Sequence, residues 1–280
     1  MKPQYILVVG GPDTGKTHYC IQLMLRLEAQ GSAARYFEPP ANIEPLKEAR
    51  SLVTAGKSAD HTVGKTTKEV VLPLEFPGGD RARIVWPEYA GEQLNQLVSS
   101  RHAGSAWAER AKWGDAWLLF IRHEHIMEAR DLLNRPIPKW TESRKEPTEG
   151  TDWMPQARLI EMLQMMLFLR RASRRSPMRS PRLAVVLSCW DTFPDQNAFK
   201  RPEDALRTLA PLVADFIETN WHSAARFVIA LSALGKSLDR VKPDEEFMDN
   251  GPASQGWLIK PDGERTPDLT WPLVNLAQMP

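Results

Sequence analysis

The chain has 280 residues, of which 42% are hydrophobic and 25% are charged, and this profile is typical of a globular protein with one large domain. The 36 basic and 35 acidic side chains give a net charge of +1, which argues against a chain built mainly to coat nucleic acid or an anionic membrane. Two cysteines are too few for a disulfide framework and fit a reducing compartment.

The first predicted element is a buried strand, because residues 4–10 (QYILVVG) form an apolar run that ends in glycine. Its apolar stretch is too short for a secretory signal. The most apolar helix pattern, at residues 157–172, is interrupted by Glu161 and is too short to span a bilayer. We therefore expect a cytoplasmic protein.

An amphipathic helix is predicted next, over residues 16–30, before the glycine stop at Gly31. Further strands are predicted at residues 68–76, 81–89, 115–123, 182–190 and 226–234. Further helices are predicted at residues 91–101, 125–134, 157–173 and 202–221. This alternation predicts an α/β, three-layer fold with a mostly parallel sheet, and the hairpin turn PGGD at residues 77–80 adds one antiparallel edge strand.

The chain is expected to form a main domain over residues 1–238 and a small C-terminal extension over residues 239–280, packed on that domain. Residues 123–180 are longer than one crossover needs, so they are interpreted as a helical, partly flexible insertion. Within them, methionines and leucine recur at helical spacing, which favours core packing over a recognition groove. These residues are Met162, Met165, Met166 and Leu169.

A phosphate-binding loop is the strongest motif, because residues 10–17 (GGPDTGKT) match G-x-x-x-x-G-K-[ST] between a buried strand and a helix. Glycines let backbone N–H groups surround a phosphate, and the helix N-terminus adds partial positive charge. Lys16 can reach the β- and γ-phosphate oxygens, and the Thr17 hydroxyl can hold Mg²⁺. The candidate nucleotide-binding residues here are Gly10, Asp13, Thr14, Gly15, Lys16, Thr17 and His18.

Three shorter segments also follow predicted strands: WPEYAG at residues 86–91, SCWD at residues 188–191 and SAL at residues 232–234. In parallel sheets, ligands bind at the carboxyl ends of the strands, where these segments fall. Together with the phosphate-binding loop they resemble the nucleotide-binding segments of Ras-like, translation-factor-related P-loop GTPases. The resemblance covers residues 8–235 and implies a P-loop NTPase fold and a site for GTP or GDP with Mg²⁺.

The resemblance implies how the base is recognised. Asp191 stands at the position of the guanine-reading carboxylate, and Ser232, Ala233 and Leu234 stand in the loop that closes over the base. A carboxylate can accept two hydrogen bonds from the guanine N1–H and 2-amino groups, whereas adenine lacks both donors. Cys189 is also assigned to the base site.

Cys189 replaces the lysine whose stem packs on the guanine ring in the family. The neighbouring Trp190 either compensates by packing on the base or is a core aromatic, and both interpretations stay open. Arg101, Arg110 and Arg122 fall near the predicted site, but no motif assigns a catalytic role to any of them.

The resemblance also implies a catalytic set of Lys16, Gly91 and Glu92. Gly91 stands where the γ-phosphate is sensed, and Glu92 stands where the family has the glutamine that orients the attacking water. The charge of Glu92 is repelled by the γ-phosphate, so we expect slow hydrolysis or a group supplied by a partner. Glu92 and Gln93 fit equally well as an exposed first helical turn.

The Mg²⁺ ligands implied by the resemblance are Thr17, Thr62 and Glu88. Glu88 stands in place of the family's aspartate. Thr62 is preferred because TVG at residues 62–64 is similar to a common family segment, and Thr66 and Thr67 remain competitors.

A narrower resemblance is to bacterial double-GTPase proteins, carried by the CWD segment, the long insertion and the tail with PDG at residues 261–263. It implies a nucleotide-dependent switch with protein partners in a bacterial conflict system. From the composition and charge we expect no membrane span and no nucleic-acid partner. Two alternatives stay open. One is a non-hydrolysing, nucleotide-binding scaffold, and the other is a P-loop ATPase or kinase.

Overall fold

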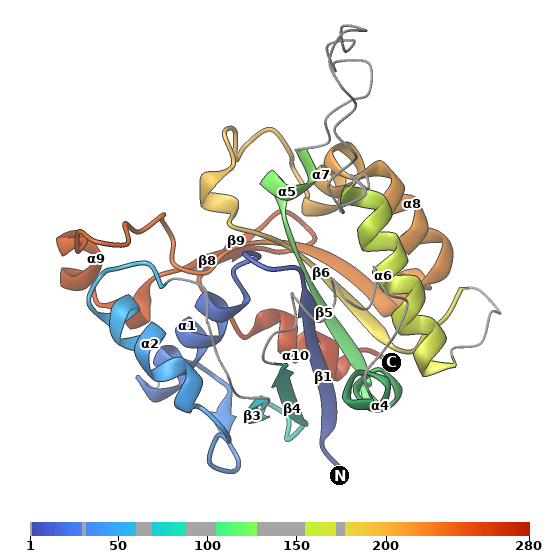
Figure 1. Cartoon of the computed structure of the whole chain (residues 1–280), viewed down its shortest axis with the longest axis horizontal. Helices are drawn as coiled ribbons and strands as arrows, with labels where there is room; N and C mark the ends of the chain where they lie inside the picture. The colour runs from blue at the N-terminus through green and yellow to red at the C-terminus, as the bar shows by residue number, and fades with distance from the viewer. Residues whose placement is uncertain (1, 30–31, 60–68, 88–104, 128–154, 172–176) are drawn as a thin grey trace, which may run out of the picture.

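A computed structural model describes residues 2–29, 32–59, 69–87, 105–127, 155–171 and 177–280 (Figure 1). These residues form an α/β fold around one nine-stranded sheet. The strands are β1 (Gln4–Gly10), β2 (Arg35–Tyr36), β3 (Val70–Glu75), β4 (Arg81–Trp86), β5 (Ala116–Arg122), β6 (Arg182–Ser188), β7 (Arg226–Ser232), β8 (Trp257–Ile259) and β9 (Arg265–Thr266). Their order across the sheet is β2-β3-β4-β1-β5-β6-β7-β8-β9.

The centre of the sheet is parallel, as predicted, from β4 through β1, β5 and β6 to β7. The prediction of a single antiparallel edge strand is wrong, because both edges are antiparallel. β3 and β2 extend one edge through the hairpin with β4, and β8 and β9 extend the other edge beyond β7. Strands of two or three residues are too short to show the alternation by which a strand is recognised in a sequence.

Helices cover both faces of the sheet, which gives the three layers (Figure 1). They are α1 (Lys16–Glu28), α2 (Lys47–Thr54), α4 (Ser105–Trp113), α5 (His123–Met127), α6 (Pro155–Arg170), α7 (Pro202–Leu209), α8 (Pro211–Asn220), α9 (Glu245–Asp249) and α10 (Trp271–Gln278). Leu7 and Val9 of β1 pack in one core cluster with α4, α6, α7 and α8, whereas Ile6 and Val8 pack in a second cluster with α1 and α10. This two-residue alternation is what a strand buried on both faces requires.

The predicted helix over residues 202–221 is two helices in the structure. Ala210 separates α7 from α8, with φ of −138° and ψ of 61°. Pro211 follows it, and a proline disfavours helical geometry at the residue before it. The proline then takes the first position of α8, where its missing N–H removes no helical bond.

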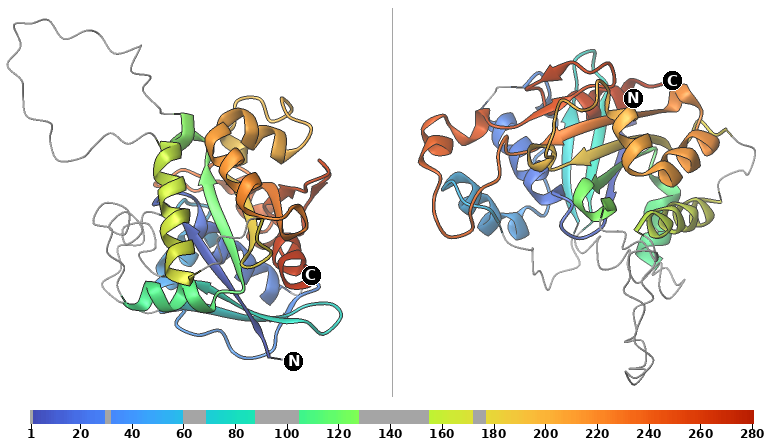
Figure 2. Two further views of the ribbon diagram at one scale, coloured as in Figure 1. Left: turned by 90° about the vertical axis from the view of Figure 1, so that its right-hand side faces the viewer. Right: turned by 90° about the horizontal axis from the view of Figure 1, so that it is seen from above.

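The described part of the predicted insertion is packed into the core. α6 lies against α4 and α8, and Figure 2 shows α6 beside α8. Met162 and Met166 are 4% and 0% exposed, so core packing of the methionines is confirmed there. The division of the chain at residue 238 stays a prediction, although β8 extends the sheet and α10 packs on its face. No helix in the described ranges is long and apolar enough to cross a membrane.

Candidate functional site

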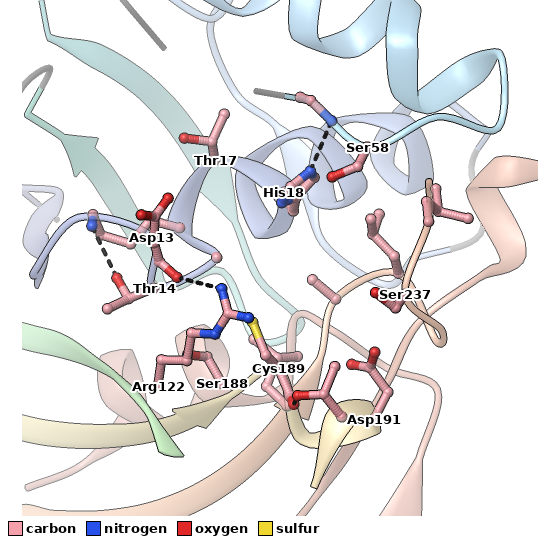
Figure 3. Close-up of a pocket in the computed structure, with 18 of the residues that line it drawn as sticks. Asp13, Thr14, Thr17, His18, Ser58, Arg122, Ser188, Cys189, Asp191 and Ser237 are labelled. Atoms are coloured by element: carbon pink, nitrogen blue, oxygen red, sulfur yellow. Dashed lines mark hydrogen bonds between the residues drawn. The ribbon is translucent and has the colours of Figure 1, made fainter. Parts of the chain in front are cut away.

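A pocket of about 340 Å³ opens at the carboxyl ends of β1, β5, β6 and β7 (Figure 3). Residues from the loop after β1 form one end of it, and residues from the turns after β6 and β7 form the other. Its lining residues are Asp13, Thr14, Gly15, Lys16, Thr17, His18, Ser58, Ala59, Arg122, Ser188, Cys189, Asp191, Thr192, Leu231, Ala233, Leu234, Lys236, Ser237, Leu238 and Arg240.

The loop between β1 and α1 needs glycine at two positions. Gly10 has φ of 151°, and a Cβ atom there would lie 2.7 Å from the carbonyl oxygen of Phe120 on β5. Gly15 has φ of 75° and stands directly before α1. Side chains rarely adopt these conformations, so the two glycines fix the path of the loop around its centre. The N-terminus of α1 therefore points into the pocket, where it favours an anion.

Lys16 lies over the centre of this loop. Its Nζ donates to the carbonyl oxygen of Gly10 at 3.0 Å, to Thr14 Oγ1 at 3.0 Å and to the carbonyl oxygen of Gly11. Burial lowers the pKa of the ammonium group from 10.5 to about 8, and the nearby Asp13 carboxylate opposes that shift. At neutral pH the group therefore carries its charge in the place where a nucleotide phosphate is expected.

The other end of the pocket presents the Asp191 carboxylate. Asp191 lies in a short 3₁₀ turn, Trp190–Thr192, directly after β6. Ser232, which is fully buried at the end of β7, donates from Oγ to Asp191 Oδ1 at 2.6 Å and accepts from the backbone N–H of Gly235 at 2.9 Å. The carboxylate is thereby oriented through one oxygen, and Ala233 and Leu234 line the pocket beside it.

His18 connects α1 to the segment that precedes Thr62. Its Nε2 accepts a hydrogen bond from the backbone N–H of Ala59 at 3.2 Å (Figure 3). Burial lowers the pKa of the imidazole, Asp191 opposes the shift and Arg122 adds to it. A neutral ring is what this bond requires, because a protonated Nε2 is a donor and cannot accept.

The two interpretations of Trp190 are separated by the structure. Its side chain is 1% exposed and stacks on Phe193, with ring centroids 4.5 Å apart and planes 9° apart. Trp190 is a core aromatic, so the idea that it packs on the base in place of the missing lysine is wrong. The adjacent Cys189, with φ of 55°, lines the pocket instead.

The helix that begins at the glycine loop is tied to the C-terminal part of the chain. Tyr19, Gln22 and Arg26 lie on one stripe of α1. Tyr19 donates to the carbonyl oxygen of Leu269 at 2.8 Å, and Gln22 donates to those of Pro252 and Gln255 at 2.6 and 2.7 Å. Arg26, 8% exposed, donates to the carbonyl oxygens of Ser254, Gln255, Gly256 and Pro267.

The same C-terminal segment supports the end of the pocket that holds Asp191. Trp257 of β8 pairs with Ser232 of β7. Gly256 has φ of 88°, and a Cβ atom there would lie 2.2 Å from the carbonyl oxygen of Ala233. Only glycine therefore lets this segment reach the loop at residues 232–234.

Most of the residues predicted for the nucleotide site lie together. Ten of them line the pocket: Asp13, Thr14, Gly15, Lys16, Thr17, His18, Cys189, Asp191, Ala233 and Leu234. Gly10 and Ser232 adjoin the pocket through their bonds to Lys16 and Asp191. The four others, Thr62, Glu88, Gly91 and Glu92, lie outside the described residues, so their placement stays a prediction.

Sequence reasoning left several lining residues unassigned. Arg122 comes from the end of β5, Ser58 from the segment after α2, and Lys236, Ser237 and Arg240 from the segment after residues 232–234. For Arg122, the signal available in the sequence was its position at the carboxyl end of a predicted strand. Lys236 forms ion pairs with Asp244 and Glu246.

Comparison with known proteins gives a family. The sequence model of the family described as Double-GTPase 1 matches residues 7–276. The crystal structure of a bacterial selenocysteine-specific elongation factor, EF-Sec, is similar over 83% of this chain, with 13% identity and a TM-score of 0.34. This chain spans 26% of the EF-Sec chain, and a likeness at that TM-score carries no argument about function. No curated protein matches the chain.

Proposed function

The chain belongs to the Double-GTPase 1 family, and on that premise we propose that it binds GTP and GDP in the pocket after β1, β6 and β7 and acts as a nucleotide-dependent switch. The observation that carries the proposal is one pocket with a phosphate-binding loop at one end and an oriented carboxylate at the other. We further propose that it hydrolyses GTP slowly or with a partner, within a bacterial multi-protein system.

The choice of guanine is supported by the geometry at Asp191. The bond from Ser232 engages Oδ1 and orients the group toward the pocket that Asp191 lines. Guanine would place two N–H donors on this carboxylate, whereas adenine would leave a partly buried charge without those donors. The same pocket is therefore expected to discriminate strongly against ATP.

Mg²⁺ fits the chemistry of the phosphate end. The Thr17 hydroxyl lines the pocket one residue after Lys16, and a hydroxyl oxygen is a suitable ligand for this ion beside phosphate oxygens. Thr62 and Glu88 complete the proposed ligand set. When bound, the ion neutralises charge on the β- and γ-phosphates.

Lys16, Gly91 and Glu92 form the proposed catalytic set. Lys16 would bind the transferred phosphoryl group and stabilise its charge, because its ammonium already lies over the loop. Glu92 in place of glutamine favours slow hydrolysis, since its charge is repelled by the γ-phosphate. That same substitution favours the second candidate function, a non-hydrolysing scaffold that keeps its nucleotide as a sensory ligand.

The first experiment identifies the nucleotide. The freshly purified protein is denatured and the released compound is separated by ion-exchange chromatography, and GTP is then competed against ATP for the emptied site. We expect a guanine nucleotide and a preference for GTP of at least about 100-fold. Release of an adenine nucleotide, or a preference for ATP, would overturn the proposal in favour of an ATPase or kinase.

The second experiment separates switch from scaffold. Phosphate release is measured with GTP and Mg²⁺, alone and with candidate partner proteins. Slow release that a partner accelerates is the expected result. Retained GTP with no release under any of these conditions would leave the scaffold as the function.

A further inference from the structure

At position 189, beside Asp191, the chain lacks the lysine that the family resemblance leads one to expect. Cys189 occupies the lysine position, and burial raises the pKa of its thiol to about 11, so the side chain is neutral at physiological pH. A thiol also has no long stem to lie along a purine ring. The function of that lysine is therefore either lost or supplied from elsewhere in the fold.

The neighbouring strand delivers a cation to the same place. β5 and β6 are parallel, and their register pairs Arg122 with Ser188, the residue directly before Cys189. Arg122 lines the pocket, as does Cys189. Figure 3 shows the Arg122 guanidinium between Asp13 and Cys189, and its charge favours the thiolate form of Cys189, which agrees with that placement.

The guanidinium is held at both of its ends. Nη1 donates to the carbonyl oxygen of Asp13 in the glycine loop at 3.2 Å, and Nη2 lies 2.5 Å from Glu124 Oε2. Glu124 also accepts from Thr192 Oγ1 at 3.0 Å, next to Asp191. The described contacts therefore run from the glycine loop through Arg122 and Glu124 to the base-reading turn. The arginine Nε–H is buried and has no hydrogen-bond partner among the described residues.

We propose that Arg122 replaces the missing lysine as the base-contacting cation of the site, with its planar guanidinium packed on the purine ring of the bound guanine nucleotide. This inference rests on the proposed function. A guanidinium is planar and weakly hydrated, so it packs on aromatic rings better than an ammonium does. Glu124 is its positioning residue, because it fixes the guanidinium against the glycine loop.

The test distinguishes a contact between Arg122 and the base from a general effect of its positive charge on an anionic ligand. GDP affinity is measured by calorimetry for the wild type and for Arg122→Ala, and the affinity for inorganic tripolyphosphate is measured by competition. We expect Arg122→Ala to weaken GDP by about 3- to 30-fold and tripolyphosphate by less than about 2-fold. The matched control is Arg207→Ala, which removes an ion-paired arginine remote from the pocket and leaves both affinities unchanged.

A second substitution tests directly whether Arg122 takes the place of the missing lysine. Adding Cys189→Lys to Arg122→Ala restores the cation at the position where the family has it, and GDP affinity should return to within about 3-fold of the wild type. Circular dichroism and the melting temperature confirm that each variant is folded. Failure of a folded double variant to regain affinity contradicts the inference.

The outcomes distinguish this inference from the proposed function. A wild-type protein that binds no GDP overturns the proposed function itself. A wild-type protein that binds GDP, with an Arg122→Ala variant that binds equally well or loses both probes by the same factor, overturns only the role of Arg122.

Discussion

The two ends of the pocket are built in different ways. The phosphate end comes from one continuous stretch, residues 10–17, whose conformation is set by glycines at fixed positions. The other end is assembled from strand ends that are far apart in the chain, because Asp191 follows β6 and is bonded to Ser232 at the end of β7, while Arg122 at the end of β5 lines the same pocket. A contiguous motif can be recognised without knowing the fold, whereas an assembled one depends on strand order and register.

This difference affects how well each end of the pocket tolerates amino-acid substitutions. The loop at residues 10–17 is one contiguous stretch, so we expect that a change at one of its positions is not compensated by another part of the fold. At the base end, the loss of a cation at position 189 leaves room for another strand to supply one, as we propose for Arg122. We therefore expect the phosphate end to tolerate substitutions less well than the other end.

The largest effect is expected at the phosphate end. Lys16→Ala removes the ammonium that lies over the glycine loop, and GDP affinity should fall by about 100-fold or more, because charge-assisted hydrogen bonds to phosphate are among the strongest in proteins. Calorimetry measures the change. The matched control is Lys47→Ala, since Lys47 is exposed and forms an ion pair with Glu44. An Asp191 variant with the larger loss would reverse the comparison.

A smaller change is expected for Asp191→Asn. The amide oxygen can still accept from Ser232, so the turn should keep its shape, but the charge that guanine requires is gone. GTP affinity should fall by about 10- to 100-fold, and xanthosine triphosphate should bind better than it does to the wild type. Competition between the two nucleotides measures this change in nucleotide preference. A variant that loses GTP without gaining the xanthine nucleotide would contradict a base-reading role.

Ser232→Ala should have a milder effect, because it removes the group that orients the carboxylate and leaves the carboxylate itself in place. The serine hydroxyl is bonded to both Asp191 and Gly235. We expect about 5-fold weaker GTP binding, corresponding to about 1 kcal/mol for one hydrogen bond. The preference for guanine over adenine should persist. A loss equal to that of Asp191→Asn would show that orientation, rather than charge, dominates the base end.

The smallest effect is a pH dependence at the phosphate end. Burial lowers the pKa of Lys16 to about 8 in the ligand-free protein, and phosphate binding favours the charged form. Affinity should therefore fall by about 4-fold between pH 7 and 8.5, as the free protein loses this proton. Calorimetry in buffers of different ionisation enthalpy would detect proton uptake on binding. Lys16→Ala should show no such uptake.

Much of the central fold could be predicted from the sequence, for reasons that particular residues make plain. The run over residues 4–10 is apolar on both faces, so it predicts β1 correctly. Ala210 and Pro211 also carried a readable signal, since a proline inside a helical pattern indicates a boundary. The strands β8 and β9 could not be predicted, because their pairing depends on β7 being at an open edge of the sheet.

The candidate site also has residues that could be predicted from the sequence and residues that could not. Lys16 and its loop follow from the spacing of the motif, and the role predicted for Asp191 follows from a family resemblance of the segment after β6. Arg122 was placed near the site by its position at the end of a predicted strand, but no role could be assigned to it, because nothing in the sequence around it specifies that β5 lies beside β6 in a register that opposes it to Ser188. Trp190 could not be assigned either, since its burial depends on Phe193 being in stacking range.

The stripe of Tyr19, Gln22 and Arg26 on α1 has a mechanical consequence. It anchors α1, the helix that begins at the glycine loop, to the backbone of residues 252–269, and the same stretch packs closely on the loop at residues 232–234 through Gly256. This stretch therefore connects the two ends of the pocket and fixes the distance between the glycine loop and the loop at residues 232–234, which a nucleotide must span. Detachment of this stretch from the domain would therefore weaken nucleotide binding at both ends of the pocket at once.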